Sequence, residues 1–425
     1  MTPARRTAVG HPWERVARAG PRAADVKGWQ TSQGYIVAMI LALNTGSSTI
    51  KFGLFQTSPE WRELLGGELD ELEGFPQLKV NGPLGTRVAR DQWQPAARET
   101  LVNRLLDWIQ HHLVGPLRAV GHLVPHGGSR FVKPVIVDEA VLEALGELAI
   151  LAPVQLACLL PIRIFRDRFP KMPQVACFDT AFHSTIAGPA LRYAIPPALE
   201  GEGVRCFGSH GLSFEAIAAA LASRGDGAES DRIIVAHLGR GASLCAMRGL
   251  KSVDTTMGFS TLEGLMGTRP SAIDPGILLW LLRKKRYSID QLEHFLYYQC
   301  GMLGVSGIAA DIRTLLASEV PEAGEALDLF VFQVTRHVAA LTATLGGLDR
   351  LVFTGGVGEN VPWVRDRICA RLAWLGISLD EQANRAGGAV VSCPESTVRV
   401  EIIPTDEQRM IGRHTYEVLR PRLAA

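Results

Sequence analysis

The stretch ILALNTGSSTIKFGLF, residues 40–55, joins two apolar runs through a short turn of small polar residues. The runs at 40–43 and 50–55 have the length and composition of buried strands. The intervening NTGSST (44–49) is rich in residues that favour tight turns. Such small residues also let consecutive backbone N–H groups approach an anion. The stretch therefore predicts a strand–turn–strand unit whose turn is suited to phosphate.

A second stretch, RIIVAHLGRGASLCAM at residues 232–247, has the same organisation: an apolar strand, a turn containing Gly and Ser, and a second strand. Two such units in one chain suggest two related domains that face each other. Chance similarity of two hairpins is the alternative interpretation, and only the chemistry of the turns decides between them.

Helical and extended patterns alternate along the rest of the chain. Apolar residues recur at helical spacing in TLVNRLLDWIQHHL (100–113), and residues 325–345 predict a long amphipathic helix. The runs AVGHLV (119–124), QVACF (174–178) and LVFTGG (351–356) predict further strands. Strands interleaved with helices predict a mixed α/β fold.

Composition limits the classes of partner and compartment. A length of 425 residues suffices for two core-bearing domains, and 44 Lys plus Arg against 43 Asp plus Glu leave a net charge of +1. This balance provides no overall field toward nucleic acid or anionic lipid, so any anion must bind at a local site. The seven cysteines are scattered and never form C-x-x-C, which argues against a disulfide framework or a structural zinc site and fits a reducing cytosol.

No run reaches the roughly 18–20 apolar residues that a membrane helix needs, and no signal-peptide pattern is present. The sequence thus predicts a soluble cytoplasmic protein with neither membrane nor nucleic acid as a partner. Residues 1–38 are rich in Arg, Ala, Gly and Pro without apolar periodicity, which predicts a disordered extension, with Met39 as a plausible alternative start. A targeting peptide is the alternative for this segment.

Three small-residue turns, each after an apolar run, offer groups that bind phosphate. Lys51 follows the turn at 44–49 and can supply a point charge. The second turn, HLGRGAS (237–243), contains two glycines, and the third, TGGVGEN (354–360), precedes a predicted helix with Pro362 in its first turn. None has the G-x-x-x-x-G-K-[ST] spacing of a P-loop. A single turn of this kind can be purely structural, but the three together predict nucleotide binding.

Seven motifs, in the same order along the chain, resemble signatures of the acetate kinase family. They are NTGSSTIKF (44–52), FDTAFH (178–183), HGLS (210–213), TMGFSTLEGLMGTR (256–269), SGIAADIR (306–313), FTGGVGEN (353–360) and PTDE (404–407). The resemblance extends from Met39 to the C-terminus. It implies a two-domain sugar kinase, Hsp70 and actin-like fold of duplicated ribonuclease H-like domains, and a homodimer. It also implies Mg²⁺ and ATP as cofactors, with a short carboxylate such as acetate converted to an acyl phosphate. The implied domains are 39–184 plus 409–425, and a nucleotide-binding domain at 185–408.

The resemblance also implies roles for individual residues. Arg269 and His210 match residues that lie against the transferring phosphoryl group, and Asn44 and Glu407 match the magnesium site. Asp179 matches an active-site aspartate. Since a short carboxylate is already ionised at neutral pH, it needs no general base, and we expect Asp179 to orient Arg269 or the waters of the metal.

The remaining matches fall into two groups. The nucleotide-binding group is Lys51, His237, Leu238, Gly239, Arg240, Gly241, Asp311, Ile312, Arg313, Gly356, Val357, Gly358, Glu359 and Asn360. The substrate-binding group is Leu123, Pro125 and Gln155.

Several positions depart from the family pattern. Leu123 replaces an arginine, Gln155 a histidine, Arg240 an asparagine and Ser209 a phenylalanine, and one residue is missing between Leu265 and Met266. Leucine at 123 removes a cation from a site that handles two anions, and Arg240 is expected to replace part of that charge from the opposite domain. Three interpretations remain open: a weak or altered carboxylate kinase, a nucleotide-binding protein with a regulatory role, and a structural paralogue.

Overall fold

The computed structural model describes residues 38–423 apart from 47, 58–59, 72–73 and 114. The predicted extension at 1–38 therefore lies outside the described residues except for Ala38. Within the described part, no helix is both long and apolar enough to cross a membrane.

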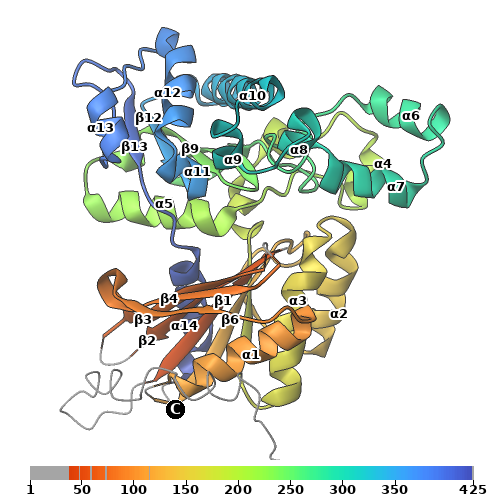
Figure 1. Ribbon diagram of the computed structural model, residues 1–425, viewed down its shortest axis with the longest axis vertical. Helices are drawn as coiled ribbons and strands as arrows, with labels where there is room; N and C mark the ends of the chain where they lie inside the picture. The colour runs from red at the N-terminus through yellow and green to blue at the C-terminus, as the bar shows by residue number, and fades with distance from the viewer. Residues whose placement is uncertain (1–37, 47, 58–59, 72–73, 114, 424–425) are drawn as a thin grey trace, which may run out of the picture.

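The chain forms two halves, each built on a mixed sheet (Figure 1). The first sheet has the order β5-β4-β3-β2-β1-β6-β8-β7 among the described residues. Its strands are β1 (Met39–Thr45), β2 (Thr49–Gln56), β3 (Arg62–Asp70), β4 (Gln77–Asn81), β5 (Arg87–Gln92), β6 (Leu117–Val124), β7 (Val135–Ile136) and β8 (Gln174–Phe178). The second sheet has the order β11-β10-β9-β12-β13. Its strands are β9 (Arg232–Leu238), β10 (Ala242–Arg248), β11 (Lys251–Thr255), β12 (Arg350–Thr354) and β13 (Arg399–Ile402).

Both predicted strand–turn–strand units are confirmed as antiparallel hairpins. In the first sheet β1 pairs with β2, and on its other side it pairs in parallel with β6. In the second sheet β9 pairs antiparallel with β10 and in parallel with β12. Each hairpin thus occupies the same place in its own sheet, as expected for two related halves.

Helices cover both faces of each sheet. Others, such as α6 and α7, extend to the side of the second half (Figure 1). The helices are α1 (Arg98–His111), α2 (Glu139–Glu147), α3 (Val154–Arg168), α4 (Pro197–Gly201), α5 (Gly211–Arg224), α6 (Pro275–Arg283), α7 (Ile289–His294), α8 (Gly301–Ser306), α9 (Ile312–Leu316), α10 (Pro321–Leu345), α11 (Gly355–Asn360), α12 (Pro362–Arg371), α13 (Glu381–Ala386) and α14 (Glu407–Leu423). The predicted helices at 100–113 and 325–345 are confirmed as α1 and α10.

The cores follow from these layers. Apolar residues of α1 and α3 pack on one face of the first sheet, and those of α14 pack on the other. The helices α10 and α12 cover one face of the second sheet. Helix α5 serves both halves, because Leu212 belongs to the cluster around α14 whereas Phe214 and Ile217 pack under the second sheet. Because α5 packs on both halves, it links them next to the region where the predicted site residues lie.

Candidate active site

The two predicted metal ligands are in contact although 363 residues separate them in the sequence. Asn44 lies near the end of β1, Glu407 begins α14, and the Asn44 amide nitrogen donates to Glu407 Oε2 at 2.6 Å. Burial raises the pKa of Glu407, while the Lys51 charge and the bond from Asn44 oppose that rise. The amide oxygen of Asn44 and the carboxylate oxygens of Glu407 are hard donors of the type that Mg²⁺ prefers.

Asp179 immediately follows β8 and is buried. The Leu212 N–H at the start of α5 donates to its Oδ1 at 3.3 Å, and the Gly211 N–H donates to its backbone carbonyl at 2.9 Å. Burial, followed by the nearby Glu407 charge, raises the pKa of Asp179 well above its ordinary value. Two carboxyl groups that repel each other in a buried place fit a site for a divalent cation, which would relieve that repulsion.

His210 precedes α5 and adopts a left-handed backbone conformation with φ of 57°. Its Nδ1 is 2.8 Å from Ser243 Oγ, and its ring stacks on His237 with centroids 4.4 Å apart. Burial, helped by His237 and Arg269, lowers the pKa of His210 well below its ordinary value, so the ring is neutral near pH 7. A hydroxyl that donates to Nδ1 leaves the proton on Nε2, where it can be donated to an oxyanion.

Gly241 closely approaches the ring of this histidine. A Cβ at position 241 would lie 2.9 Å from His210 Nε2. The second glycine turn therefore needs glycine here because of close approach to an imidazole nitrogen.

Arg269 ends the segment 256–269 that was singled out in the sequence. Its Nη1 donates to the Thr261 carbonyl at 2.9 Å, and its guanidinium lies 5.8 Å from the centroid of the Tyr297 ring. Burial lowers the pKa of Arg269, but an arginine stays charged at neutral pH. In the described part of the chain, no hydrogen bond or ion pair joins Arg269 to Asp179. The carboxylate oxygen of Asp179 is engaged instead by the backbone of α5.

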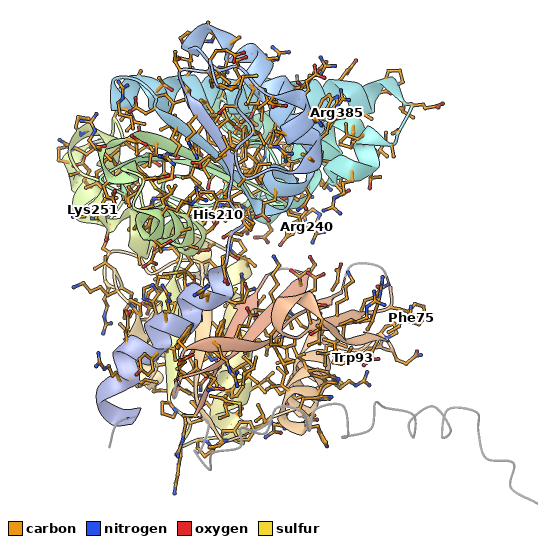
Figure 2. The ribbon with its side chains drawn as sticks, turned by 90° about the vertical axis from the view of Figure 1, so that its left-hand side faces the viewer. Phe75, Trp93, His210, Arg240, Lys251 and Arg385 are labelled. Carbon is orange, nitrogen blue, oxygen red and sulfur yellow. The ribbon has the colours of Figure 1, made fainter. Side chains whose placement is uncertain are left out.

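Arg240 connects the two halves of the molecule. It lies in the turn between β9 and β10, and its Nη1 donates to Ser48 Oγ in the turn between β1 and β2. Figure 2 shows Arg240 and His210 on the side of the second half that faces the first. The Thr268 N–H also donates to the Arg240 carbonyl at 3.3 Å, so this turn packs beside the segment carrying Arg269.

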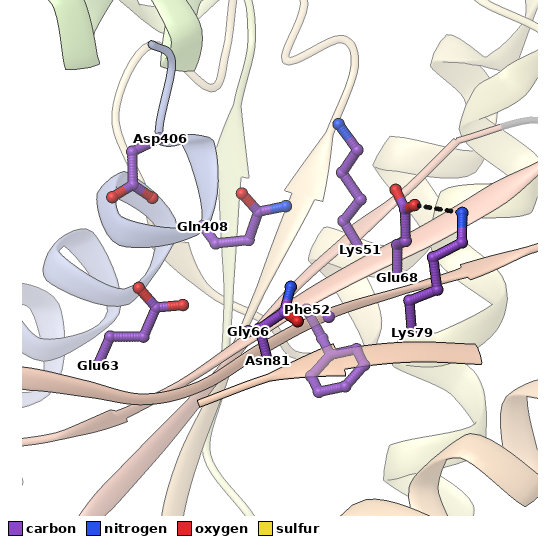
Figure 3. A pocket seen from close by; sticks show the side chains of 10 residues that line it. Lys51, Phe52, Glu63, Gly66, Glu68, Lys79, Asn81, Asp406 and Gln408 are labelled. Carbon is purple, nitrogen blue, oxygen red and sulfur yellow. Dashed lines mark hydrogen bonds and ion pairs between the residues drawn. The ribbon is translucent and has the colours of Figure 1, made fainter. Parts of the chain in front are cut away.

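Lys51 lies on β2 next to the Asn44 end of the hairpin. Its charge lowers the pKa of both His237 and Glu407. The ammonium group therefore lies near predicted site residues of both halves. Figure 3 shows its side chain pointing away from the Glu68–Lys79 ion pair, at the edge of a hollow of about 370 Å³. The walls of that hollow are formed mainly by β2–β4 and the start of α14. Of the residues that line it, Lys51 is the one that belongs to the predicted site.

The third glycine turn is not a loop. Residues Gly355–Asn360 form the short helix α11, which starts directly at the end of β12. The sequence TGGVGEN (354–360), with three glycines and three polar residues, concealed this helix. The stabilising interaction comes from a side chain, because Glu359 accepts from the Gly355 N–H at 2.8 Å. Gly355 has φ of 79°, and a Cβ there would lie 2.8 Å from the Leu238 carbonyl. The second and third turns are therefore packed against each other.

The predicted nucleotide residues differ in what they expose. Asp311 caps α9 by accepting from the Thr314 N–H at 3.0 Å, and Arg313 is exposed. Ile312 and Leu238 are buried in the core of the second half. Only the backbone of these two residues can face a ligand.

The three predicted substrate residues are all buried. Leu123, on β6, belongs to the apolar cluster of α14 and α5. Pro125 is buried directly after that strand. Gln155 is fully buried, accepting from the His126 N–H at 2.8 Å and donating to the Leu145 carbonyl at 2.6 Å. Gln155 thus braces the segment after β6, and no hydrogen bond joins it to Arg269 in the part of the chain that the structure describes.

Sequence reasoning did not identify Ser243, Ser48 or Thr405 as contacts of site residues. Ser243 is hydrogen-bonded to His210, and Ser48 accepts a hydrogen bond from Arg240. Thr405 takes part in a further chain of hydrogen bonds that is described below. All three lie inside motifs that were quoted, so the signal was present, but nothing in the pattern indicates which hydroxyl contacts which partner.

Comparisons with known proteins identify the family of this chain. Residues 39–413 match the model of the acetokinase family. An acetate kinase of Nitrobacter hamburgensis is 43% identical over 392 residues, covering 90% of this chain and 96% of that protein. A propionate kinase structure from Francisella tularensis superposes with a TM-score of 0.80 at 32% identity, covering 90% of this chain and 100% of that one. The acetate kinase structure from Porphyromonas gingivalis gives 0.75 at 33% identity, with the same coverage.

The fold is therefore the two-lobed sugar kinase, Hsp70 and actin-like α/β fold expected from the motifs, with a ribonuclease H-like sheet in each half. The chain belongs to the acetokinase family.

Proposed function

We propose that this protein transfers the γ-phosphoryl group of Mg²⁺–ATP to a short carboxylate such as acetate, which yields ADP and an acyl phosphate. One observation carries the proposal. Asn44, Glu407, Lys51, His210 and Arg269 come from both halves of an acetokinase-family chain, and their contacts and charges converge on one region.

The proposed chemistry is in-line displacement through a loose transition state, whose charge is spread over the equatorial oxygens. Positioned cations and N–H donors stabilise such a charge without needing a covalent step. Arg269 supplies a guanidinium fixed by the Thr261 carbonyl and the Tyr297 ring. Neutral His210 donates a hydrogen bond from Nε2, and Lys51 neutralises a phosphate of the nucleotide.

Asn44 and Glu407 would hold the magnesium ion. When bound, the ion neutralises charge on the phosphates and on the buried carboxyl pair. Asp179 lies close enough to Glu407 for the two charges to interact, so it fits a role in binding the metal's waters. A role for Asp179 in orienting Arg269 has less support, because its Oδ1 already accepts from the Leu212 N–H.

The nucleotide's base and ribose are assigned to the second half, at residues 237–241, 311–313 and 356–360, except that Glu359 receives a different role below. The packing of the second and third turns supports this, because it places two glycine-rich backbones side by side. A regulatory or structural protein that binds nucleotide without turnover is the second candidate. The apolar packing of Leu123 points to it, whereas the family match and the acetate kinase relatives favour the kinase.

Three broader properties belong to the same proposal. The domains are taken as 39–184 with 409–425, and 185–408, which the separate sheets and the packing of α14 on the first sheet support. The protein is proposed to act in the cytoplasm, where ATP and short carboxylates occur together.

A homodimer is also proposed, formed through the apolar side chains that α6 and the segment after α7 expose. Ile277, Leu279, Trp280 and Tyr298 are 45%, 49%, 51% and 59% exposed, respectively. Such a patch on a soluble enzyme is typical of an interface. Sedimentation equilibrium should give twice the chain mass, and Trp280→Glu should shift the protein toward the monomer. A wild-type monomer at micromolar concentration would contradict this assignment.

A coupled assay across formate, acetate, propionate and butyrate tests the proposed function. We expect ADP release that requires Mg²⁺ and one of these carboxylates. Tight binding of Mg²⁺–ATP without turnover on any of the four would favour the nucleotide-binding candidate. No nucleotide binding at all would leave only a structural role.

Arg240→Asn is expected to lower kcat by about 10- to 100-fold, the worth of one or two charge-assisted hydrogen bonds. The reason is that Arg240 is the cation which reaches from the second half to the phosphate turn of the first. The double variant Leu123→Arg with Arg240→Asn, which puts the family residues back at these two positions, should recover activity. Arg385→Asn, a surface change in an exposed ion pair, is the control. A silent Arg240→Asn would show that its contact with Ser48 has no catalytic role.

A further inference from the structure

One crossing of the chain between the two halves leads directly to a predicted metal ligand. Residues 403–406 leave β13 of the second sheet and enter α14, which packs on the first sheet; this crossing descends between the halves in Figure 1. Glu407 is the first residue of α14. The position of Glu407 relative to Asn44 therefore depends on how this crossing, residues 403–406, is held.

Glu359 holds the crossing from the third glycine segment. A single oxygen, Oε1, accepts from the Gly355 N–H at 2.8 Å, from the Thr405 N–H at 3.1 Å and from Thr354 Oγ1 at 3.4 Å. Two of these donors belong to the β12–α11 junction and the third belongs to the crossing. The carboxylate thus joins the predicted nucleotide segment to the chain that carries Glu407.

Thr405 is also anchored through its side chain. Its Oγ1 donates to Ser213 Oγ on α5 at 2.8 Å, and Ser213 Oγ is 2.8 Å from His237 Nδ1. The ring of His237 is the one that stacks on His210. The crossing is therefore tied at one residue both to the glycine segment and to the histidine pair.

Direct contact between Glu359 and the phosphates is disfavoured on electrostatic grounds. A carboxylate close to a triphosphate repels it, and this repulsion is strong where water is excluded. A carboxylate oxygen that accepts hydrogen bonds from three protein donors has, in contrast, a structural role that requires an acceptor at this position. Because its Oε1 accepts from three protein donors, a positional role for Glu359 replaces the predicted nucleotide contact.

We propose that Glu359 is a positioning residue for metal binding: through Thr405 it sets the place of Glu407, so that occupancy of the α11 segment by nucleotide and binding of Mg²⁺ are coupled. The proposal rests on the proposed function in one respect, the assignment of Glu407 to the metal. Coupling of this kind is reciprocal, so Mg²⁺ must tighten nucleotide binding by the same factor as nucleotide tightens Mg²⁺ binding.

Calorimetry with ADP, in EDTA and in saturating Mg²⁺, tests this without requiring turnover. We expect Glu359→Ala to leave ADP affinity in EDTA within about threefold of the wild type and to reduce the Mg²⁺-dependent gain in affinity by about tenfold or more. Glu359→Gln keeps an acceptor oxygen and should retain most of the gain. Glu381→Gln, an exposed acidic residue of the same half, is the matched control and should match the wild type.

A second variant covers the case in which Glu359→Ala fails to fold. Thr405→Val removes the bond to Ser213 with little change in volume, and it should reduce the Mg²⁺-dependent gain in the same direction by about threefold. An equal loss of ADP affinity with and without Mg²⁺ in Glu359→Ala would identify a direct nucleotide contact and overturn the proposal. An unchanged gain in both variants would overturn it too. If the wild type shows the Mg²⁺ gain but phosphorylates no carboxylate, the proposed function fails while the positioning role stands.

Discussion

Arg269→Ala is expected to lower kcat for acyl phosphate formation by about 10³-fold, with a much smaller change in the KM for ATP. Removal of one well-placed donor to a developing oxyanion costs about 10²- to 10³-fold, and an arginine at a transferring phosphoryl group lies at or above that range. The loss should appear in kcat because the charge that Arg269 meets is spread over the phosphoryl oxygens only in the transition state.

The lysine variant separates charge from geometry. In the structure the guanidinium is held by the Thr261 carbonyl and faces the Tyr297 ring, so its plane is fixed before substrate binds. Lysine keeps the charge but has neither the planar fork nor five donors. Arg269→Lys should therefore show most of the kcat loss of Arg269→Ala. Arg385→Ala, a change in an exposed ion pair, should leave kcat unchanged. A decrease in kcat of less than tenfold in Arg269→Ala would show that Arg269 does not stabilise the transition state.

The second large effect is expected at the metal end. Glu407→Gln should raise the Mg²⁺ concentration required for half-maximal activity by about 100-fold, and added Mg²⁺ should restore part of the rate. The glutamine oxygen can still accept from Asn44, whose amide now donates to Glu407 Oε2, so the local geometry is kept while the negative charge is lost. A cation held by few protein oxygens depends strongly on the charge of each.

Glu417→Gln supplies the control on the same helix, because Glu417 is exposed on α14 and only approaches His414, at 3.9 Å. It should leave the Mg²⁺ requirement unchanged. If Glu407→Gln instead lowers kcat equally at every Mg²⁺ concentration, Glu407 acts on the reaction by another route than metal binding.

Local patterns in the sequence were sufficient for the elements that carry the site. The apolar runs on either side of the turns at 44–49 and 239–241 predicted both hairpins, and the structure has them at the same places in the two sheets. The period of residues 325–345 predicted α10 because a helix of that length repeats its apolar face many times.

Long-range contacts were beyond the reach of those patterns. No local pattern links Asn44 to Glu407, so their pairing was expected only from the family resemblance. The glycine-rich residues at 355–360 suggested a loop, but the Glu359 side chain accepts from the Gly355 N–H and so stabilises the first turn of α11. Whether a polar residue binds substrate or braces the backbone depends on its burial, as the two backbone bonds of Gln155 illustrate.

The departures from the family pattern acquire a physical meaning in the structure. Leu123 does not leave an empty place, because it packs with the apolar residues of α5 and α14. Arg240, in contrast, extends from the second half to Ser48 of the first. Of these two positions, only 240 carries a cation, and that cation lies at the contact between the halves.

The most direct test of this account is ³¹P NMR of the purified protein with ATP, Mg²⁺ and acetate. The account predicts a new acyl phosphate resonance that grows as ADP appears, that requires Mg²⁺, and that is absent with Arg269→Ala. ATP that remains intact with formate, acetate, propionate and butyrate, under conditions where calorimetry shows Mg²⁺–ATP to be bound, would contradict it.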